Sequence, residues 1–384
     1  MKAVFEKTGT LEGLCKTIEA TCRQLNPGGL MILAGDANDF SATAMAAMLK
    51  KFSIPLFGGI FPQIVFDGKN YEKGCVVVSM QAAPEIICVK NLGDPNAVYE
   101  EQLAPFADKW GQPGKSNGET FIVFVDGLSR GISSLIQDMF YCFGLQRNYI
   151  GGGAGSLSLQ QKPCLITPEG LLQDAAVIAR LPLPCGTGVA HGWESISEGL
   201  KVTEAEGNVL QTLDWRPAFE VYRELVEAHS GLKFSESNFF EIAKSYPFGI
   251  TRLDTEVIVR DPLMKNVSNG LVCVGAIPPG SFVRLLHGRP ESLIEAATRT
   301  RLLAESSAHG NIVSGNAFII DCISRALFLG TRIEEELQAA GGKHSLFGAL
   351  TLGEIANSGQ DYLEFFNKTT VIGIFDDEII NNPG

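Results

Sequence analysis

Apolar and polar positions along the chain follow two periods, one typical of amphipathic helices and one typical of buried strands. A helical period runs from Leu11 to Leu25 and ends at the turn sequence 26–29. The apolar run 30–34 then predicts a buried strand, and a second helical stripe covers 44–52. Strand-like runs separated by turn residues follow at 55–61, 75–80 and 85–92. This order describes one unit of strand, helix, strand and hairpin.

The same order returns twice. A second copy has the apolar run 121–127 and the helical stripe 132–143, and a third begins at 317–321 and continues into a helix that reaches Leu337. Each copy places a glycine-containing strand directly after its helix, at 55–59, 148–152 and 345–349. The spacing is too long and irregular for a solenoid. We therefore predict an α/β (α+β) fold, a layered sandwich of repeated strand-helix-strand-hairpin units with helices outside and sheets within.

A different stretch separates the second and third copies. It has hairpin spacing over 200–209 and then a helix that starts near Pro217, a residue that suits the first turn of a helix. We place a domain boundary after Trp215 for this reason. The predicted segments are an N-terminal helix and cap (1–27), a first domain (28–215), a second domain (216–374) and a C-terminal tail (375–384).

Composition narrows the classes of protein. The 384 residues include 31 Lys and Arg against 43 Asp and Glu, a formal charge of −12, and 45% are hydrophobic. That balance supports real cores and gives no basic surface for nucleic acid or an anionic membrane. The nine cysteines are scattered and never form CxxC, which is typical of buried thiols in a reducing compartment. Without a signal peptide or a long uncharged apolar run, we predict a cytoplasmic protein.

The histidines are the first candidates for chemistry. His191 lies between two glycines, at the end of an apolar strand and beside the aromatic Trp193. It is the best candidate for a metal or haem ligand, although a strand histidine also serves as a hydrogen-bonded structural residue. His287 is the second candidate, with Arg289 available for a carboxylate or propionate. The alternative for Arg289 is a surface charge ahead of the helix that begins at Pro290.

Glycines at the end of the second repeat offer another candidate site. Gly151, Gly152 and Gly153 form either a wall against which a ligand lies or a place where strands pack closely. They do not form a strong nucleotide motif, because the helix that would bind a pyrophosphate does not follow.

Three polar residues near the preceding strand end could form the mouth of a pocket or cap the next helix. They are Asp126, Ser129 and Arg130. Three further histidines carry weaker predictions: His229 and His309 suit helix ends, and His344 suits a polar loop. A thiolate ligand from Cys185 stays open as well.

Motifs of common enzymes are missing from the sequence. It contains no GxSxG, HExxH or GxxxxGK[ST], and the start Met1-Lys2 offers no N-terminal nucleophile. We therefore predict a protein that is not an enzyme, with a hydrolase-like activity as the remaining alternative.

Several segments together resemble the FIST family, whose members pair a FIST-N and a FIST-C domain. The resemblance spans roughly 28–374, and its segments are Gly151 to Gly155, Gly188 to Trp193, Glu206 to Asn208 before Leu213-Asp214, Pro217-Ala218 with Tyr222, and Tyr362 to Thr370, which includes Glu364 and Asn367. The order and spacing of these segments carry the resemblance more than any single motif.

The resemblance implies a sensor in signal transduction. Family members are thought to bind small ligands such as amino acids, and one branch binds haem and senses nitric oxide. The implied partner is a histidine kinase or a cyclic-di-GMP enzyme, reached through a contact because only ten residues follow Ile374. We thus expect a cytoplasmic ligand-binding sensor, most specifically a haem-based nitric-oxide sensor. A non-haem sensor of a small metabolite is the alternative.

Overall fold

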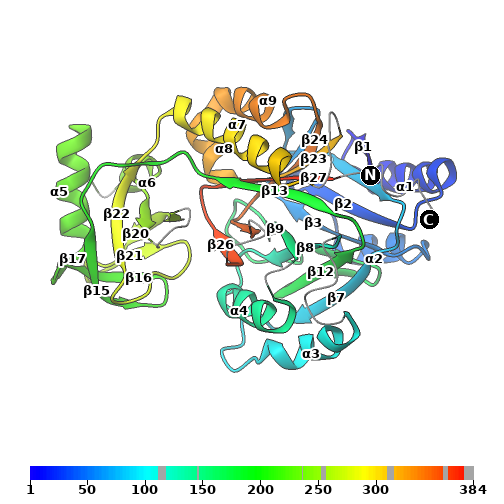
Figure 1. Cartoon of the computed structure of the whole chain (residues 1–384), viewed down its shortest axis with the longest axis horizontal. Coiled ribbons are helices and arrows are strands. Elements are labelled where there is room, and N and C mark those ends of the chain that lie inside the picture. The colour runs from blue at the N-terminus through cyan, green and yellow to red at the C-terminus, as the bar shows by residue number, and fades with distance from the viewer. Residues whose placement is uncertain are drawn as a thin grey trace.

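The computed structural model describes residues 1–110, 118–144, 147–235, 237–251, 257–308, 315–357 and 362–375. It has a large body built from three six-stranded sheets and a smaller lobe with a nine-stranded sheet (Figure 1). The helices of the body lie on the outer faces of its sheets. The predicted α/β fold with sheets within and helices outside is confirmed.

Each sheet of the body is built around one copy of the repeat. Two neighbouring strands of the copy run parallel, and the strand after the hairpin pairs antiparallel with the first of them. One preceding strand pairs antiparallel with that strand in turn, so it runs in the same direction as the parallel pair. The first sheet contains β1 (Lys2–Glu6), β6 (Cys75–Met80), β2 (Gly29–Gly35) and β3 (Leu56–Phe61). The second contains β7 (Glu85–Lys90), β12 (Ala175–Leu181), β8 (Thr120–Asp126) and β9 (Asn148–Ala154). The third contains β13 (Cys185–Ala190), β27 (Thr370–Phe375), β23 (Asn316–Cys322) and β24 (Ser345–Thr351).

The hairpin of each copy joins the sheet of a different copy. The hairpin of the first copy, β4 (Gln63–Phe66) and β5 (Lys69–Tyr71), pairs with β24 in the third sheet. The hairpin of the second, β10 (Leu165–Thr167) and β11 (Gly170–Leu172), pairs with β3 in the first sheet. The hairpin of the third, β25 (Glu354–Ala356) and β26 (Glu364–Phe366), pairs with β9 in the second sheet. The three sheets are thereby linked in a cycle.

The second parallel strand of each copy contains a glycine that is required for the same structural reason in all three. A Cβ atom on Gly58, Gly151 or Gly348 would collide with the carbonyl oxygen of the residue beside it on the parallel strand, which is Ile32, Val123 or Ile319. Glycine is required where backbone comes this close. The three copies therefore share one packing rule that the aligned sequences already display.

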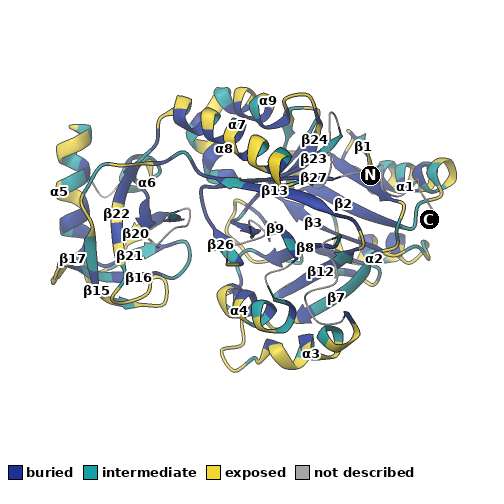
Figure 2. Cartoon of the chain, viewed as in Figure 1, coloured by how far each residue is buried: buried dark blue, intermediate teal, exposed yellow. Residues whose placement is uncertain are grey.

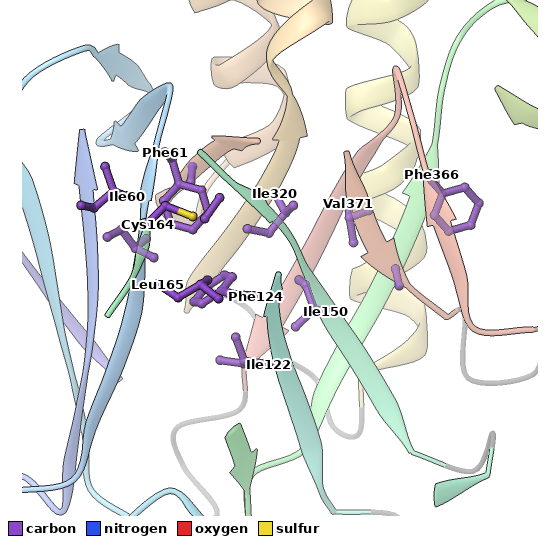
Figure 3. Packing of buried hydrophobic residues seen from close by; sticks show 14 of the residues in the cluster. Ile60, Phe61, Ile122, Phe124, Ile150, Cys164, Leu165, Ile320, Phe366 and Val371 are labelled. Atoms are coloured by element: carbon purple, nitrogen blue, oxygen red, sulfur yellow. The ribbon is translucent and has the colours of Figure 1, made fainter. Parts of the chain in front are cut away.

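Apolar side chains from the three sheets meet in a common core (Figure 3). Phe124 of β8 contacts both Phe57 and Phe61 of β3, with ring centroids 6.1 and 5.2 Å apart. Ile150, Ile320 and Val371 extend the core toward the third sheet. Burial of such side chains from water is the main favourable term in folding.

The helices cover the outer faces, and their exposed sides are visible in Figure 2. Thr10 caps the first helix through a hydrogen bond from the amide of Gly13, and Asn26 ends it in a left-handed conformation. The helices of the body are α1 (Leu11–Leu25), η1 (Asp36–Asn38), α2 (Ala42–Leu49), α3 (Tyr99–Trp110), α4 (Ile132–Phe143), α7 (Pro290–Ser307), α8 (Ile323–Leu329), η2 (Gly330–Arg332) and α9 (Ile333–Gly341). Pro290 begins α7, as its sequence predicts.

The lobe is formed by the chain between the second and third copies and stands to one side of the body in Figure 1. The predicted boundary after Trp215 falls inside it, between two paired strands. Its elements are β14 (Glu194–Ser195), β15 (Leu200–Glu206), β16 (Val209–Leu213), β17 (Arg216–Pro217), α5 (Ala218–Ser230), α6 (Phe239–Ala243), β18 (Phe248–Ile250), β19 (Ile258–Arg260), β20 (Pro262–Lys265), β21 (Leu271–Cys273) and β22 (Phe282–His287).

Candidate functional site between the lobe and the body

Glycines fix the backbone that leads from the body into the lobe. A Cβ atom on Gly188 of β13 would collide with the carbonyl oxygen of Thr300 in α7. Gly192 has φ +77, and a Cβ there would lie 2.5 Å from the carbonyl oxygen of Ser292. The segment that carries His191 and Trp193 therefore lies tightly against α7.

His191 is an interior residue. His191 is only 7% exposed, and its Nδ1 accepts a hydrogen bond of 2.8 Å from the amide of Trp193. The neutral imidazole consequently carries its proton on Nε2. Burial, together with the positive charges of Arg325 and Arg299, lowers the pKa of His191 to about 3. The ring is thus neutral at physiological pH.

Trp193 packs beside His191 at the same junction. Its indole N–H donates to the carbonyl oxygen of Lys368 at 2.9 Å, and the ammonium of Lys368 lies 4.7 Å from its ring centroid. Phe328 also packs against the indole, and the two ring centroids are 5.2 Å apart. A Cβ on Gly288 would collide with the indole. The structure therefore brings these two predicted residues together and fills the space around the indole with protein.

Arg325 of α8 is the centre of a buried ionic network. Its Nε lies 3.0 Å from a carboxylate oxygen of Asp321, and its Nη2 pairs with Glu336 of α9. Its remaining N–H groups donate to the carbonyl oxygens of His191, Leu293 and Lys368. All three charged side chains are fully buried. Such a network adds modest stability when complete, but removal of one partner leaves an uncompensated charge inside the protein.

A third carboxyl group, that of Glu354 in β25, lies in the same network. It accepts hydrogen bonds from the hydroxyl of Thr351 at 3.3 Å and from the amide of Thr369 at 3.2 Å. Burial raises the pKa of Glu354 well above its usual range, and the charge of Asp321 raises it further. Burial and the charge of Glu336 likewise raise the pKa of Asp321. The three carboxyl groups around one guanidinium thus all have raised pKa values, because burial disfavours their charged forms.

Lys368 extends the network from the body into the lobe. This residue is fully buried and adopts a left-handed conformation with φ 52. Its ammonium lies 3.1 Å from Asp261 and donates to the carbonyl oxygen of Lys244 at 2.8 Å. Both of these partners belong to the lobe. The Lys368 ammonium is thus a direct ionic link between the two parts of the molecule.

Arg260 makes the reciprocal link from the lobe into the body. Its Nη1 donates to the carbonyl oxygen of Phe365 at 3.1 Å and to Oδ1 of Asn367 at 3.4 Å. Its Nη2 lies 3.5 Å from Glu364 of β26. Glu364 and Asn367, which carry part of the family resemblance, thus contact the residue that joins the lobe to β26 and the segment that follows it.

Several buried polar atoms of this network have no hydrogen-bond partner among the described residues, and two of them lie where the lobe meets the body. These two are Oδ1 of Asp261 on the lobe and Nδ2 of Asn367 on the body. These residues are only 3% and 2% exposed. A buried acceptor and a buried donor left unpaired are costly, so each requires an explanation such as a bound molecule.

The second predicted histidine lies in the lobe, at the end of a strand that borders this junction. His287 is half-buried at the end of β22, and its Nδ1 lies 3.2 Å from the carbonyl oxygen of Ser245. Arg289 is an exposed residue that pairs with Glu194 at 2.7 Å. The structure does not place these two residues with His191, and the pairing of Arg289 is that of a surface charge.

The glycine cluster lies inside the packed sheets. A Cβ on Gly151 would collide with the carbonyl oxygen of Val123, and one on Gly153 would collide with that of Leu352. A Cβ on Gly152 would approach Thr351 and the carbonyl oxygen of Gly353, at 3.0 and 2.7 Å. Close packing accounts for all three glycines, and their role as a ligand wall stays a prediction.

The predicted pocket mouth of the second copy is a set of mutual hydrogen bonds. Asp126 accepts from the amide of Asp174 and from Nε2 of Gln161, both at 2.8 Å. Ser129 donates to Asp174 at 2.7 Å. Arg130 is exposed. Asp126 and Ser129 therefore hold the turn at this strand end, and neither caps the helix that follows, because the N-cap residue of α4 is Gly131.

Most of the junction residues do not stand out in the amino-acid sequence. Arg325 and Glu336 both lie on buried faces of helices, between apolar neighbours. A charged residue within an apolar helical stripe is the signal that identifies them, because buried charges occur only with partners. Lys368 and Asp261 have no comparable signal, since each lies in a short connection between strands.

Haem would need an axial ligand and an apolar slot. At His191, iron would have to bind through Nε2, because Nδ1 accepts the amide of Trp193. The positive charges of Arg325 and Arg299 lie close enough to the ring to lower its pKa. Within the described ranges, no group of three or more His, Cys, Asp or Glu is arranged to hold a metal ion. These surroundings fit haem poorly, and haem binding through His191 stays a prediction.

Comparison with known proteins is consistent with this architecture. The FIST N domain model matches residues 29–216, and the FIST C domain model matches residues 218–357. No curated protein matches the chain. In the part of the chain that the structure describes, no helix is both long and apolar enough to cross a bilayer.

The fold and the junction define an α/β protein in which a lobe is joined to a three-sheet body through buried charges. The chain belongs to the FIST family, because the two models together cover most of its length. FIST domains are sensors of signal transduction that bind small ligands and signal to partners.

Proposed function

We propose that this chain senses a small polar metabolite, with free amino acids as the first class to test, at the junction between the lobe and the body. The observation that carries the proposal is the pair of unpaired buried atoms, Oδ1 of Asp261 and Nδ2 of Asn367. A carboxylate oxygen accepts a hydrogen bond from an ammonium group, and an amide N–H donates one to a carboxylate. A zwitterion supplies both groups.

The same residues offer a route for the signal. Asp261 also pairs with Lys368, and Asn367 also accepts from Arg260, so a ligand at these atoms competes with the links between lobe and body. A ligand shifts an equilibrium only by its different affinity for the two states. A change in the position of the lobe would then be read by a partner, for which a histidine kinase or a cyclic-di-GMP enzyme is the proposed class.

Thermal denaturation with each free amino acid tests the proposal. A ligand at a hundred times its Kd stabilises the folded state by about 2.7 kcal/mol, which raises the melting temperature measurably. Asp261→Asn and Asn367→Ala should both abolish the rise. Glu206→Gln, an exposed change in the β15–β16 turn region of the lobe, is the control and should retain it.

Two outcomes contradict the metabolite proposal. One is a chain that no small polar metabolite stabilises, and the other is stabilisation that persists in both junction variants. The haem alternative has its own measurement, the visible spectrum of protein expressed with iron. A Soret band that disappears in His191→Ala would establish haem as the ligand and replace the metabolite proposal.

A further inference from the structure

A second cluster of titratable rings lies in the lobe, outside the junction described above. His229 ends α5, His287 ends β22, and Tyr246 lies between α6 and β18. The two imidazole centroids are 4.9 Å apart, and the phenol ring of Tyr246 stacks on His287 at 4.7 Å. Residues distant in sequence thus bring two imidazoles into contact.

Hydrogen bonds fix the Nδ1 atoms of both rings. Nδ1 of His287 lies 3.2 Å from the carbonyl oxygen of Ser245, which only accepts, so Nδ1 carries the proton. Nδ1 of His229 lies 3.0 Å from the hydroxyl of Tyr246. This arrangement leaves the lone pair of His287 on Nε2. A metal-binding histidine usually donates its other N–H to a carbonyl or similar group in this way.

The Nε2 atoms are available for a ligand. Neither has a hydrogen-bond or ionic partner within the described ranges, and His229 is exposed to solvent. With metal–nitrogen bonds of about 2.0–2.1 Å, two imidazoles on one tetrahedral ion have centroids roughly 5 Å apart. The observed separation of 4.9 Å agrees with that requirement.

We infer that His229 and His287 bind a divalent transition-metal ion of the zinc, nickel or copper type, with water in the remaining positions. Imidazole nitrogen is a preferred ligand of these ions. Glu194 lies directly across from His287 in the β14–β22 pairing, but its carboxylate is paired with Arg289. The site therefore has two protein ligands, and both belong to the lobe.

The site would brace the lobe next to the junction. Ser245, the residue that orients His287, follows Lys244, whose carbonyl oxygen accepts the ammonium of Lys368. A metal that joins α5 to β22 would hold this segment of the lobe in place. The inference does not depend on the identity of the proposed metabolite.

Calorimetric titration of the untagged, chelator-treated chain with zinc chloride tests the site. We expect one zinc ion per chain and at least a tenfold loss of affinity in His229→Ala and in His287→Ala. Tyr246→Phe keeps both ligands but removes the hydrogen bond to His229, so it should weaken binding about tenfold. Glu241→Gln, an exposed change on the same lobe, is the control and should bind as the wild type does.

Three results would overturn the inference: no zinc binding by the wild type, unchanged binding in His229→Ala, or an equal loss in Glu241→Gln. The exposed position of His229 keeps the test valid if His287→Ala fails to fold. Zinc should also raise the melting temperature of the wild type and leave that of His229→Ala unchanged. A negative zinc result leaves the metabolite titration unaffected, so the two proposals fail separately.

Discussion

The second and third copies of the repeat share a fold but use the carboxyl ends of their parallel strands differently. In the second copy Asp126 accepts hydrogen bonds from Asp174 and Gln161 of the same copy. In the third copy Asp321 is buried against Arg325, in a network that continues through Lys368 into the lobe. One strand end closes local turns, whereas the other connects two parts of the molecule. The fold that the copies share therefore determines where a site can form. The side chains at that position determine whether one forms.

Removal of the central cation should have the largest effect. Arg325→Met leaves Asp321 and Glu336 buried without a positive partner, which should lower the free energy of unfolding by about 3–5 kcal/mol. Urea unfolding followed by circular dichroism measures the change. Arg332→Met is the control, since Arg332 pairs with Glu335 on the surface and its loss should change little. Equal stability of the two variants would contradict the role of the network.

The shared frame predicts a smaller and equal effect in both copies. Gly151→Ala and Gly348→Ala each place a Cβ against a neighbouring carbonyl oxygen. Overpacking of this kind should cost about 1–3 kcal/mol in each case, measured by the same unfolding experiment. Gly118→Ala is the control, because a Cβ there meets nothing within 4 Å. Clearly unequal costs at 151 and 348 would show that the copies do not share the packing rule.

A change in the second copy should remain local. Asp126→Asn changes a side chain that accepts three hydrogen bonds and should cost about 1.5 kcal/mol of stability. It should leave the response to the metabolite unchanged, because Asp126 has no link to the lobe among the hydrogen bonds described. Thermal denaturation with and without metabolite measures both quantities. Loss of the response in this variant would remove the distinction between the two strand ends.

The smallest expected effect is a pH dependence of stability that the third copy has because of Glu354. The folded state raises the pKa of Glu354, so it binds the proton more tightly than the unfolded chain, in which the pKa is near 4.5. As pH rises above that value, the unfolded state releases the proton first, and stability falls by at most about 1.4 kcal/mol per pH unit for this group. Glu354→Gln should therefore lose stability less steeply than the wild type. Identical slopes from pH 5 upward, in urea unfolding, would contradict the raised pKa.

The repeat could be predicted from sequence because each copy carries its own local signals. The helical stripe 132–143 and the glycines at 58, 151 and 348 are visible without any knowledge of contacts. The exchange of hairpins is different. The pairing of Leu165 with Gly59 joins strands of two copies, and no local pattern specifies which sheet a hairpin will join.

The candidate site was predictable only in part. His191 and Trp193 stood out by their place beside a glycine at the end of an apolar strand. The structure places both at the junction. Asp261 and Lys368 lie more than a hundred positions apart, so their ion pair depends on how the lobe returns to the body. The contact between His229 and His287 has the same origin, since it joins the end of a helix to the end of a distant strand.

Because the hairpins are exchanged in a cycle, biosynthesis cannot finish the sheets one at a time. The β4–β5 hairpin leaves the ribosome early, but its partner strand β24 is made almost three hundred residues later. A fragment that ends between the two matched domains, near residue 217, would lack β25 and β27, which pair with β9 and β13. The edges of these two strands would then be exposed. Exposed strand edges recruit other strands, so such a fragment should aggregate where the full chain does not.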